Sequence, residues 1–547
     1  MGKMYFPQYE TGRKKGINLV VGRTVLEHIR RAGGIEINSE CGGQGRCEKD
    51  LIRVEKGLSS LTKITPAEQK FLDRAKLTPG YRLACQARVA RDDSDIEIFI
   101  RDFGKYTILT ESIDTGVEIS PCVFRKDGKV FYHTGEELGS YKGRMLGLAV
   151  DIGTTTLVMQ VVDLETGKNI GTIASKNPQI AYGNDVISRG GYAMTHEGGL
   201  KELQAVVVNG IKSSLEEMEE NLKVAADSIN KYIYDVVIVG NSIMRSIFCG
   251  QDPSPLAVMP FEPSDKKPVT LSASGMGFSF NPEARVYGPP LIGGHAGADC
   301  LADIISTRLY ESGDIEMIID IGTNGEVVIG NRHKIMTASC AAGGAYEGYQ
   351  ISCGVGAVEG AITNVWSDNG KLEYATLGGK PAAGVCGSGV IDLLAELLRI
   401  GVMDERARIG SPYRITDGLS ISQDDINQLI MAKAGLRTDQ DLLVKYFGTS
   451  YDNVSKIFLA GAFGNFIDVS NAMKIGLYPP IDKNKFVRFG NGALAGARDM
   501  LLSKRRRADA ERIAVFARHT KPNELEGTEF QYMVAGNMYF NRNILQK

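Results

Sequence analysis

The sequence predicts an α/β protein whose larger part is built from two similar halves and is preceded by a small α+β module. From residue 146 onward, apolar runs that read as buried strands end in glycine turns and lead into helix-like segments. One such strand and turn recurs 169 residues later. Glycine supplies 64 of 547 residues, and 15 of these lie within residues 321–390. Glycine gathered beside apolar runs indicates tight turns or a backbone that approaches a ligand closely.

Composition excludes several classes of protein. The 63 basic residues nearly balance the 65 acidic ones, which argues against a globally basic nucleic-acid binder. Nine cysteines are an odd number at low density, unlike a secreted disulfide scaffold. The chain has neither the apolar core of a signal peptide nor an apolar run long enough for a transmembrane helix. We therefore expect a cytoplasmic protein that binds neither nucleic acid nor membrane. The basic run at 504–507 is mixed with acids, so we expect a solvated helix end there.

Residues 1–100 have the pattern of a small α+β domain. The run at 17–21 alternates like a strand, and the alternation at 95–100 predicts a closing strand. Between them, Thr24 and Glu27 stand at the spacing of a capping box, which predicts a helix start. Residues 101–145 contain several turn signals and short strand-like pieces, so they form either a linker or a small packed subdomain. Residues 146–547 form the α/β domain.

The repeated element is an apolar strand that ends in aspartate, followed by a glycine–threonine turn. The two aspartates are Asp151 and Asp320. Ligands bind at such strand ends in open α/β sheets, and two carboxylates facing each other are suited to a hydrated Mg²⁺ bound to phosphates. The alternative is two unrelated turns, because Asp–Gly and Gly–Thr pairs are ordinary turn chemistry. The candidate phosphate-binding residues are Gly153, Thr154, Thr155, Thr156, Gly322, Thr323, Asn324 and Gly325.

Three further segments favour the first interpretation. The strand at 236–242 ends in Gly–Asn, the strand at 459–465 runs into a glycine turn, and 490–497 opens a helix of small residues. Together with the two turns, these segments resemble the motifs of the ATPase superfamily that contains acetate and sugar kinases, Hsp70 and actin. They occur in that superfamily's order over about 350 residues. The G-x-x-x-x-G-K-[ST] loop of P-loop proteins is absent from the sequence.

The resemblance implies a two-lobed, actin- and Hsp70-like ATPase in which each lobe is built on an RNase-H-like sheet. ATP and Mg²⁺ would lie between the lobes, and the helices that follow the segments at 236–242 and 490–497 would form the hinge. Asp151 and Asp320 would position Mg²⁺ and its waters, and Glu326 and Asn241 are candidates to orient the attacking water. The adenosine side would be lined by Gly461, Gly464 and Asn465.

The N-terminal module contains a glycine-rich cysteine loop. Cys41 and Cys47 stand in a C-x5-C pattern, and Cys85 follows. This pattern resembles the 2Fe–2S ferredoxin loop, C-x5-C-x2-C…C, in which glycines let the backbone wrap the cluster. The third position, however, is Asp50. Three interpretations are open: Asp50 is a ligand, another group completes the site, or the cluster has been lost. We favour ligation by Asp50, because the rest of the loop is intact and iron accepts carboxylate. Three simply buried thiols are a further alternative.

A ferredoxin module joined to this kind of ATPase resembles the ATP-dependent reductive activators of corrinoid proteins. Further similar segments lie at 177–189, 240–244, 293–299, 343–353 and 384–389, so the resemblance covers nearly the whole chain. It implies a 2Fe–2S cluster, ATP and Mg²⁺, and the reduction of inactive Co(II) to Co(I) in a cobalamin-dependent methyltransferase system of anaerobes. The implied partners are a corrinoid protein and an upstream electron donor, and the implied assembly is a homodimer.

Two other functions are compatible with the same residues. One is a small-molecule kinase of the same superfamily, which would need no iron. The other is an electron carrier or scaffold protein that binds ATP without turning it over.

Overall fold

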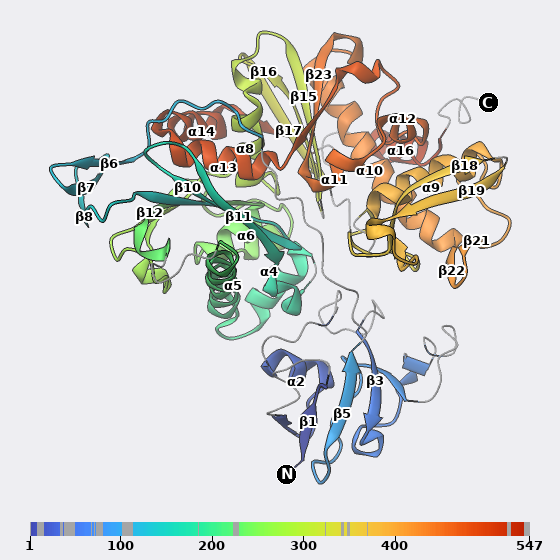
Figure 1. Cartoon of the computed structure of the whole chain (residues 1–547). Coiled ribbons are helices and arrows are strands. Elements are labelled where there is room, and N and C mark those ends of the chain that lie inside the picture. The colour runs from blue at the N-terminus through green and yellow to red at the C-terminus, as the bar shows by residue number, and fades with distance from the viewer. Residues whose placement is uncertain are drawn as a thin grey trace. The chain divides into compact units, whose positions relative to one another are not determined.

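The computed structural model describes residues 2–7, 16–32, 37, 50–66, 68–69, 72, 80–100, 113–183, 185–222, 229–322, 324–340, 344–346, 351–368, 370–521 and 527–540 (Figure 1). The chain divides into two compact units. The first comprises Met1–Gly104 with Pro178–Tyr192, and the second comprises Lys105–Asn177 with Ala193–Lys547.

The first unit contains the predicted α+β module. Its five-stranded sheet has the order β2-β1-β5-β3-β4, and β1 runs parallel to β5. Helix α2 (Val25–Ala32) begins with the predicted capping box, because Thr24 Oγ1 accepts the Glu27 N–H at 3.1 Å and the Glu27 carboxylate accepts the Thr24 N–H at 2.6 Å. The strand predicted at 17–21 is shorter. The strands are β1 (Lys3–Tyr5), β2 (Ile17–Asn18), β3 (Leu51–Lys56), β4 (Tyr81–Leu83) and β5 (Ile96–Ile100).

A small antiparallel sheet precedes the large domain. It consists of β6 (Val123–Lys126), β7 (Lys129–Tyr132) and β8 (Glu137–Ser140). Val130 and Leu138 are buried in the same hydrophobic core as the strands that follow. This part of the segment at 101–145 is therefore packed against the large domain.

The second unit is built on two six-stranded sheets with one plan, which confirms the two-lobed α/β prediction. The first has the order β11-β10-β9-β12-β14-β13, and the second has the order β24-β23-β15-β16-β17-β25. The first comprises β9 (Leu146–Ile152), β10 (Thr156–Asp163), β11 (Asn169–Lys176), β12 (Ile233–Gly240), β13 (Val269–Ser272) and β14 (Arg285–Gly288). The second comprises β15 (Ile315–Ile321), β16 (Gly325–Asn331), β17 (Lys334–Cys340), β23 (Val454–Ala460), β24 (Phe486–Gly490) and β25 (Arg518–His519).

The register of the two sheets explains the repeated sequence. β9 pairs antiparallel with β10 and parallel with β12, and β15 pairs antiparallel with β16 and parallel with β23. Asp151 is therefore the sixth residue of β9, and Asp320 is the sixth residue of β15. The same strand and turn thus occupy the same place in both lobes.

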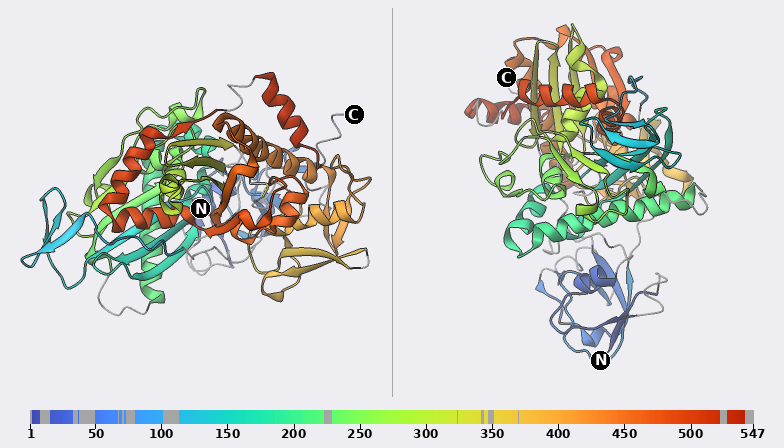
Figure 2. Two further views of the ribbon diagram at one scale, coloured as in Figure 1. Left: turned by 90° about the horizontal axis from the view of Figure 1, so that it is seen from above. Right: turned by 90° about the vertical axis from the view of Figure 1, so that its left-hand side faces the viewer.

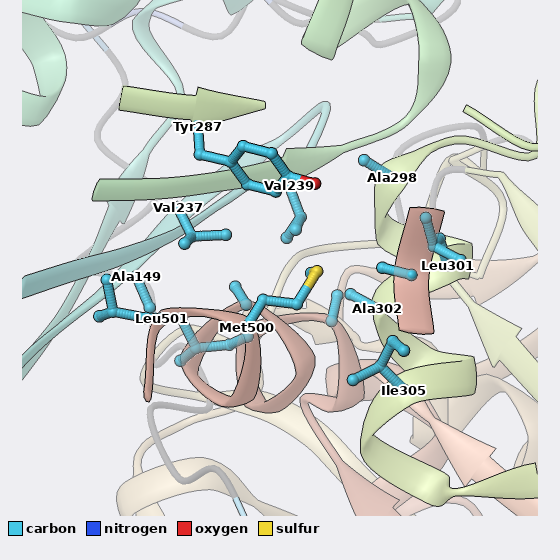
Figure 3. Packing of buried hydrophobic residues seen from close by; sticks show 14 of the residues in the cluster. Ala149, Val237, Val239, Tyr287, Ala298, Leu301, Ala302, Ile305, Met500 and Leu501 are labelled. Carbon is cyan, nitrogen blue, oxygen red and sulfur yellow. The ribbon is translucent and has the colours of Figure 1, made fainter. Parts of the chain in front are cut away.

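Two helices connect the lobes. α13 (Gly492–Leu502) follows β24 of the second sheet and packs on β9 and β12 of the first, and α8 (Ala298–Thr307) precedes β15. Met500 and Leu501 of α13 fill the space between the first sheet and α8 (Figure 3). The segment at 236–242 forms the central strand β12 and the start of α6 (Ser242–Phe248), and α6 is the helix that the sequence interpretation gave as one hinge element. The helix that partners α13 is α8.

The glycine-rich stretch before residue 390 serves close packing. A Cβ on Gly387 would lie 1.9 Å from the carbonyl oxygen of Tyr346, and one on Gly389 would lie 2.2 Å from that of Ile362. Gly389 therefore lets helix α9 (Gly387–Arg399) lie directly against the backbone of β18 (Ala361–Asp368), and Gly387 lets the start of α9 lie against the backbone at Tyr346.

Helix α5 (Gly199–Asn221) lies along β11 and α6, as the green helix in Figure 2 shows. None of the helices in the described part of the chain is long and apolar enough to cross a membrane. The remaining elements are α4 (Val186–Thr195), α7 (Ser254–Ala257), β19 (Lys371–Thr376), β20 (Gly384–Val385), β21 (Tyr413–Thr416), β22 (Leu419–Ile421), α10 (Gln423–Phe447), α11 (Gly461–Phe466), α12 (Val469–Lys474), α14 (Lys504–Phe516) and α16 (Thr528–Asn537).

Candidate functional site

The first repeated turn is held by two side-chain amides. Asn491 donates its Nδ2–H to Asp151 Oδ2 at 3.0 Å, while its Oδ1 accepts the Leu494 N–H and caps α13. Asn241 donates to Thr154 Oγ1 at 3.2 Å and caps α6 in the same way. Each amide therefore fixes a helix start and one residue of the turn at once. Asn491 was missed as a site residue, although the doublets at 240–241 and 490–491 repeat the same Gly–Asn signal.

The second repeated turn is held by another carboxyl group. Asp303, on α8, shares a hydrogen bond with Asp320. Burial and the neighbouring acids raise the pKa of Asp303 well above its usual range. Burial also raises the pKa of Asp320, to about 6, while the bond from Asp303 opposes that rise. Each of the two predicted carboxylates is thus held by a residue at a lobe-connecting helix.

Backbone atoms approach the carboxyl groups of Asp320 and Asp303 so closely that only glycine fits at the two positions concerned. A Cβ on Gly461 would lie 2.2 Å from Asp320 Oδ1, and one on Gly492 would lie 2.3 Å from Asp303 Oδ1. Gly461 also has a φ of +79°, which disfavours other residues. Gly461, predicted for the adenosine side, therefore lies directly against the second carboxylate.

Five carboxyl groups gather around these turns. Asp151, Asp299 and Asp320 keep partial solvent exposure, whereas Asp303 and Glu326 are buried. Burial raises the pKa of Asp151 to about 7, and burial together with the neighbouring acids raises that of Asp299 to about 8. Such a cluster favours a bound cation.

No group of three or more His, Cys, Asp or Glu side chains in the described residues is arranged to hold a metal by itself. Mg²⁺ is usually bound through one or two carboxylates, with waters and phosphates supplying the other ligands. Partly exposed carboxylates in a glycine-lined site therefore fit an Mg²⁺–nucleotide better than a metal held by protein alone.

The other predicted residues of this site lie on the same strand ends. Glu326 accepts a hydrogen bond from Ser339 at 3.3 Å, and burial raises its pKa well above its usual range. The Gly322 N–H donates to the Asn324 carbonyl within the second turn. Thr323 lies outside the described residues. Gly153, Thr155 and Thr156 belong to the first turn or the start of β10, Gly325 begins β16, and Gly464 and Asn465 lie on α11.

The structure describes two of the four proposed cluster ligands. Cys41 and Cys47 lie outside the described residues. Cys85 and Asp50 are both buried, and Asp50 Oδ2 accepts the Cys85 N–H at 2.5 Å. The carboxylate of Asp50 therefore lies at the backbone of the cysteine whose ligand role is implied. These two residues fit a 2Fe–2S site.

Sequence reasoning also missed Asp299 and Asp303. They stand four residues apart on α8 and so share one face of that helix. The surrounding residues are small and apolar, which in sequence resembles an ordinary buried helix. Only the packing of α8 against β15 and β16 reveals which turn these acids face.

Comparison with known proteins identifies the family. Corrinoid activation enzyme RamQ from Eubacterium limosum is 30% identical over 533 residues, covering 86% of this chain and 89% of the relative. The chain belongs to the family of reductive activators of corrinoid proteins. A second relative is the [Co(II) methylated amine-specific corrinoid protein] reductase from Methanosarcina barkeri, 27% identical over 68% of this chain and 72% of its own. The solved structure of a reductive activator for corrinoid, iron–sulfur protein matches with a TM-score of 0.69, 28% identity and 98% coverage of both chains.

Three family models match successive parts of this activator. Residues 9–90 match a 2Fe-2S iron-sulfur cluster binding domain, residues 146–312 match the RACo middle region, and residues 314–544 match the C-terminal domain of RACo, the ASKHA domain. These matches confirm the predicted 2Fe–2S module and the predicted ATPase fold. The cofactors of the chain are accordingly a 2Fe–2S cluster and ATP, with Mg²⁺ as the usual companion of ATP.

Proposed function

We propose that this enzyme reductively activates a corrinoid protein, using ATP to drive the reduction of Co(II) to Co(I). The observation that carries the proposal is one chain that joins a 2Fe–2S domain to a pair of equivalent, partly exposed carboxylates, one in the RACo middle region and one in the ASKHA domain. The names of the relatives support a corrinoid protein as the substrate.

In the nucleotide site, Asp151 and Asp320 position Mg²⁺ and its waters from the two lobes. Burial raises the pKa of both carboxyl groups, and a bound cation would stabilise their ionised forms. Asn491 and Asp303 keep the two carboxylates in place. Glu326 or Asn241 orients the attacking water, and the glycine turns admit the phosphate oxygens.

ATP is needed because the reduction of Co(II) is uphill for ordinary donors. Each ~59 mV of unfavourable potential in a one-electron step costs about 1.4 kcal/mol. ATP shifts the equilibrium between two conformations only by the difference in its binding free energy for them. A tenfold shift of that equilibrium therefore needs a difference of about 1.4 kcal/mol. Closure of the two lobes about α8 and α13 is the conformational change that the proposal uses.

In the N-terminal module, Cys41, Cys47, Asp50 and Cys85 hold the cluster. A 2Fe–2S cluster supplies electrons one at a time, which is what the change from Co(II) to Co(I) requires. The buried Asp50, bonded to the Cys85 backbone, supports a carboxylate ligand in place of the usual cysteine. The proposal further includes a corrinoid protein of a methyltransferase system as partner, an upstream electron donor, a homodimeric assembly and a cytoplasmic location.

The test is anaerobic purification, iron and sulfide analysis, and an absorbance assay of Co(I) formation on a corrinoid protein with and without ATP. Asp151→Ala and Asp320→Ala should each abolish ATP-dependent reduction and leave the cluster spectrum unchanged. Asp452→Ala, at an exposed position outside the site, is the matched control and should keep full activity. Wild-type ATPase activity in both site variants would contradict the nucleotide assignment.

Three outcomes would favour other functions. A protein without iron would not be an activator of this kind. Iron without ATP-stimulated Co(I) formation would favour an electron carrier, and a phosphorylated small-molecule product would favour a kinase.

A further inference from the structure

The described part of the connector between the two modules begins at residue 113 and is bound to the ends of both lobe-connecting helices. Thr115 donates its Oγ1–H to Asp499 Oδ1 at 2.6 Å, and Arg498 donates to the Ile113 carbonyl oxygen at 2.6 Å. Arg308, which caps the C-terminal end of α8, donates to the Thr115 carbonyl oxygen at 2.8 Å. We call residues 113–120 with these contacts the connector clamp.

Backbone bonds continue the connector clamp beyond these side chains. The Ser120 N–H donates to the Leu502 carbonyl oxygen, and the Lys504 N–H donates to the Ser120 carbonyl oxygen, both at 2.8 Å. Asp499 is fully buried and Arg498 is largely buried, so their bonds to the connector are shielded from water. The connector is therefore held at the junction of α13 and α14.

The other end of α13 lies in the nucleotide site. Its capping residue Asn491 bonds to Asp151, and Gly492 lies against Asp303. The helix rises about 1.5 Å per residue, so Arg498 and Asp499 hold the connector clamp roughly 10 Å along the helix axis from Asn491. α13 therefore contacts the acids at one end and the connector at the other.

Packing makes α13 a stiff element. A Cβ on Gly496 would lie 2.1 Å from the carbonyl oxygen of Ala302, so α13 and α8 touch through their backbones. α13 is also fixed by Met500 and Leu501, which lie among buried side chains between the first sheet and α8 (Figure 3). Because packed interfaces have discrete arrangements, a movement at one end of α13 also moves the other end.

We propose that α13 couples the nucleotide state of the ATPase domain to the connector that leads to the iron–sulfur module. This inference rests on the proposed function, because it assigns the route by which ATP controls the electron-donating module. When the lobes close on ATP, α13 keeps the hydrogen bond from Asn491 to Asp151. The C-terminal half of α13 then changes its hydrogen bonds to Thr115 and Ile113. Coupling between sites is reciprocal, so a weakened clamp also alters ATP affinity.

The experiment is hydrogen–deuterium exchange on the full-length protein, with and without Mg²⁺ and a non-hydrolysable ATP analogue. The readout is the exchange of backbone amides in residues 113–122. We expect the analogue to change exchange there at least about fivefold in the wild type. In Thr115→Val, which removes the buried hydroxyl at nearly constant volume, this difference should fall below about twofold, while ATP hydrolysis persists.

Glu118→Gln is the matched control, because it alters an exposed side chain on the same connector. It should show the wild-type response to the analogue. Calorimetric titration establishes that the analogue binds each variant. Binding with unchanged connector exchange in the wild type overturns this inference alone. Absence of binding overturns both this inference and the proposed function, and an equal response in Thr115→Val and the wild type overturns the role of the clamp.

Discussion

A glycine-to-alanine change in the middle of α13 tests the contact between the two connecting helices. At Gly496 the new Cβ would lie 2.1 Å from the carbonyl oxygen of Ala302 and 2.7 Å from its Cα. Side-chain carbons essentially never come within 3.0 Å of other heavy atoms, so the helices would have to separate by about 1 Å. The obstacle is backbone, which cannot rotate away as a side chain would.

Two opposing terms set the size of the effect. Overpacking of this kind costs about 1–3 kcal/mol, and a backbone obstacle places the cost at the upper end. Alanine in a helix interior gains roughly 1 kcal/mol over glycine. Gly496→Ala should therefore lower the free energy of unfolding by about 1–2 kcal/mol. It should also weaken ATP binding, because it moves Asp303 away from Gly492.

Gly435→Ala is the matched control, because it lies inside helix α10 with its nearest neighbour, Cys340 Cβ, at 4.0 Å. Only helix propensity changes there, so this variant should be more stable than the wild type, by up to about 1 kcal/mol. Thermal unfolding of the nucleotide-free protein, followed by calorimetry, should show midpoint shifts of opposite sign. If both variants raise the midpoint, the backbone contact between α8 and α13 does not exist as described.

Three further predictions concern charge. Burial raises the pKa of Asp151 to about 7 from an ordinary ~3.9, so the folded state holds a proton that the unfolded state has released. Stability of the nucleotide-free protein should therefore fall as pH rises from about 4 to 7, and a rising unfolding midpoint in that interval would contradict the assignment. Arg507→Met leaves the buried Asp235 without its partner and should cost about 3–5 kcal/mol in urea unfolding, whereas Arg414→Met, in an exposed ion pair, should cost under about 1 kcal/mol. Asp50→Cys should keep the iron content and strengthen sulfur-to-iron absorbance, while Asp50→Ala should lower bound iron; identical spectra in both variants would rule out ligation by Asp50.

The elements that could be predicted from the sequence depend on local patterns. The capping box at Thr24 and Glu27 involves neighbouring residues. The strand and turn at Asp151 recur at Asp320, and this repeat can be recognised by comparing one part of the sequence with another. The two-lobed plan follows from this repeat, because strands of similar sequence form sheets of similar strand order.

The remaining features depend on contacts between distant parts of the chain. Asn491 reaches Asp151 across 340 residues, a distance that no local pattern encodes. The basic run at 504–507 gives a second example, because the expectation of a solvated helix end is wrong for two of its residues. Arg507 is buried against Asp235, and Arg506 is buried against Tyr310.

The two lobes hold equivalent carboxylates by different chemistry. Asp151 and Asp320 occupy the same position in β9 and β15. Their supports do not correspond, since Asn491 precedes the first residue of α13 whereas Asp303 is the sixth residue of α8. The internal symmetry of the domain therefore extends to the strands and turns, and not to the residues that support them.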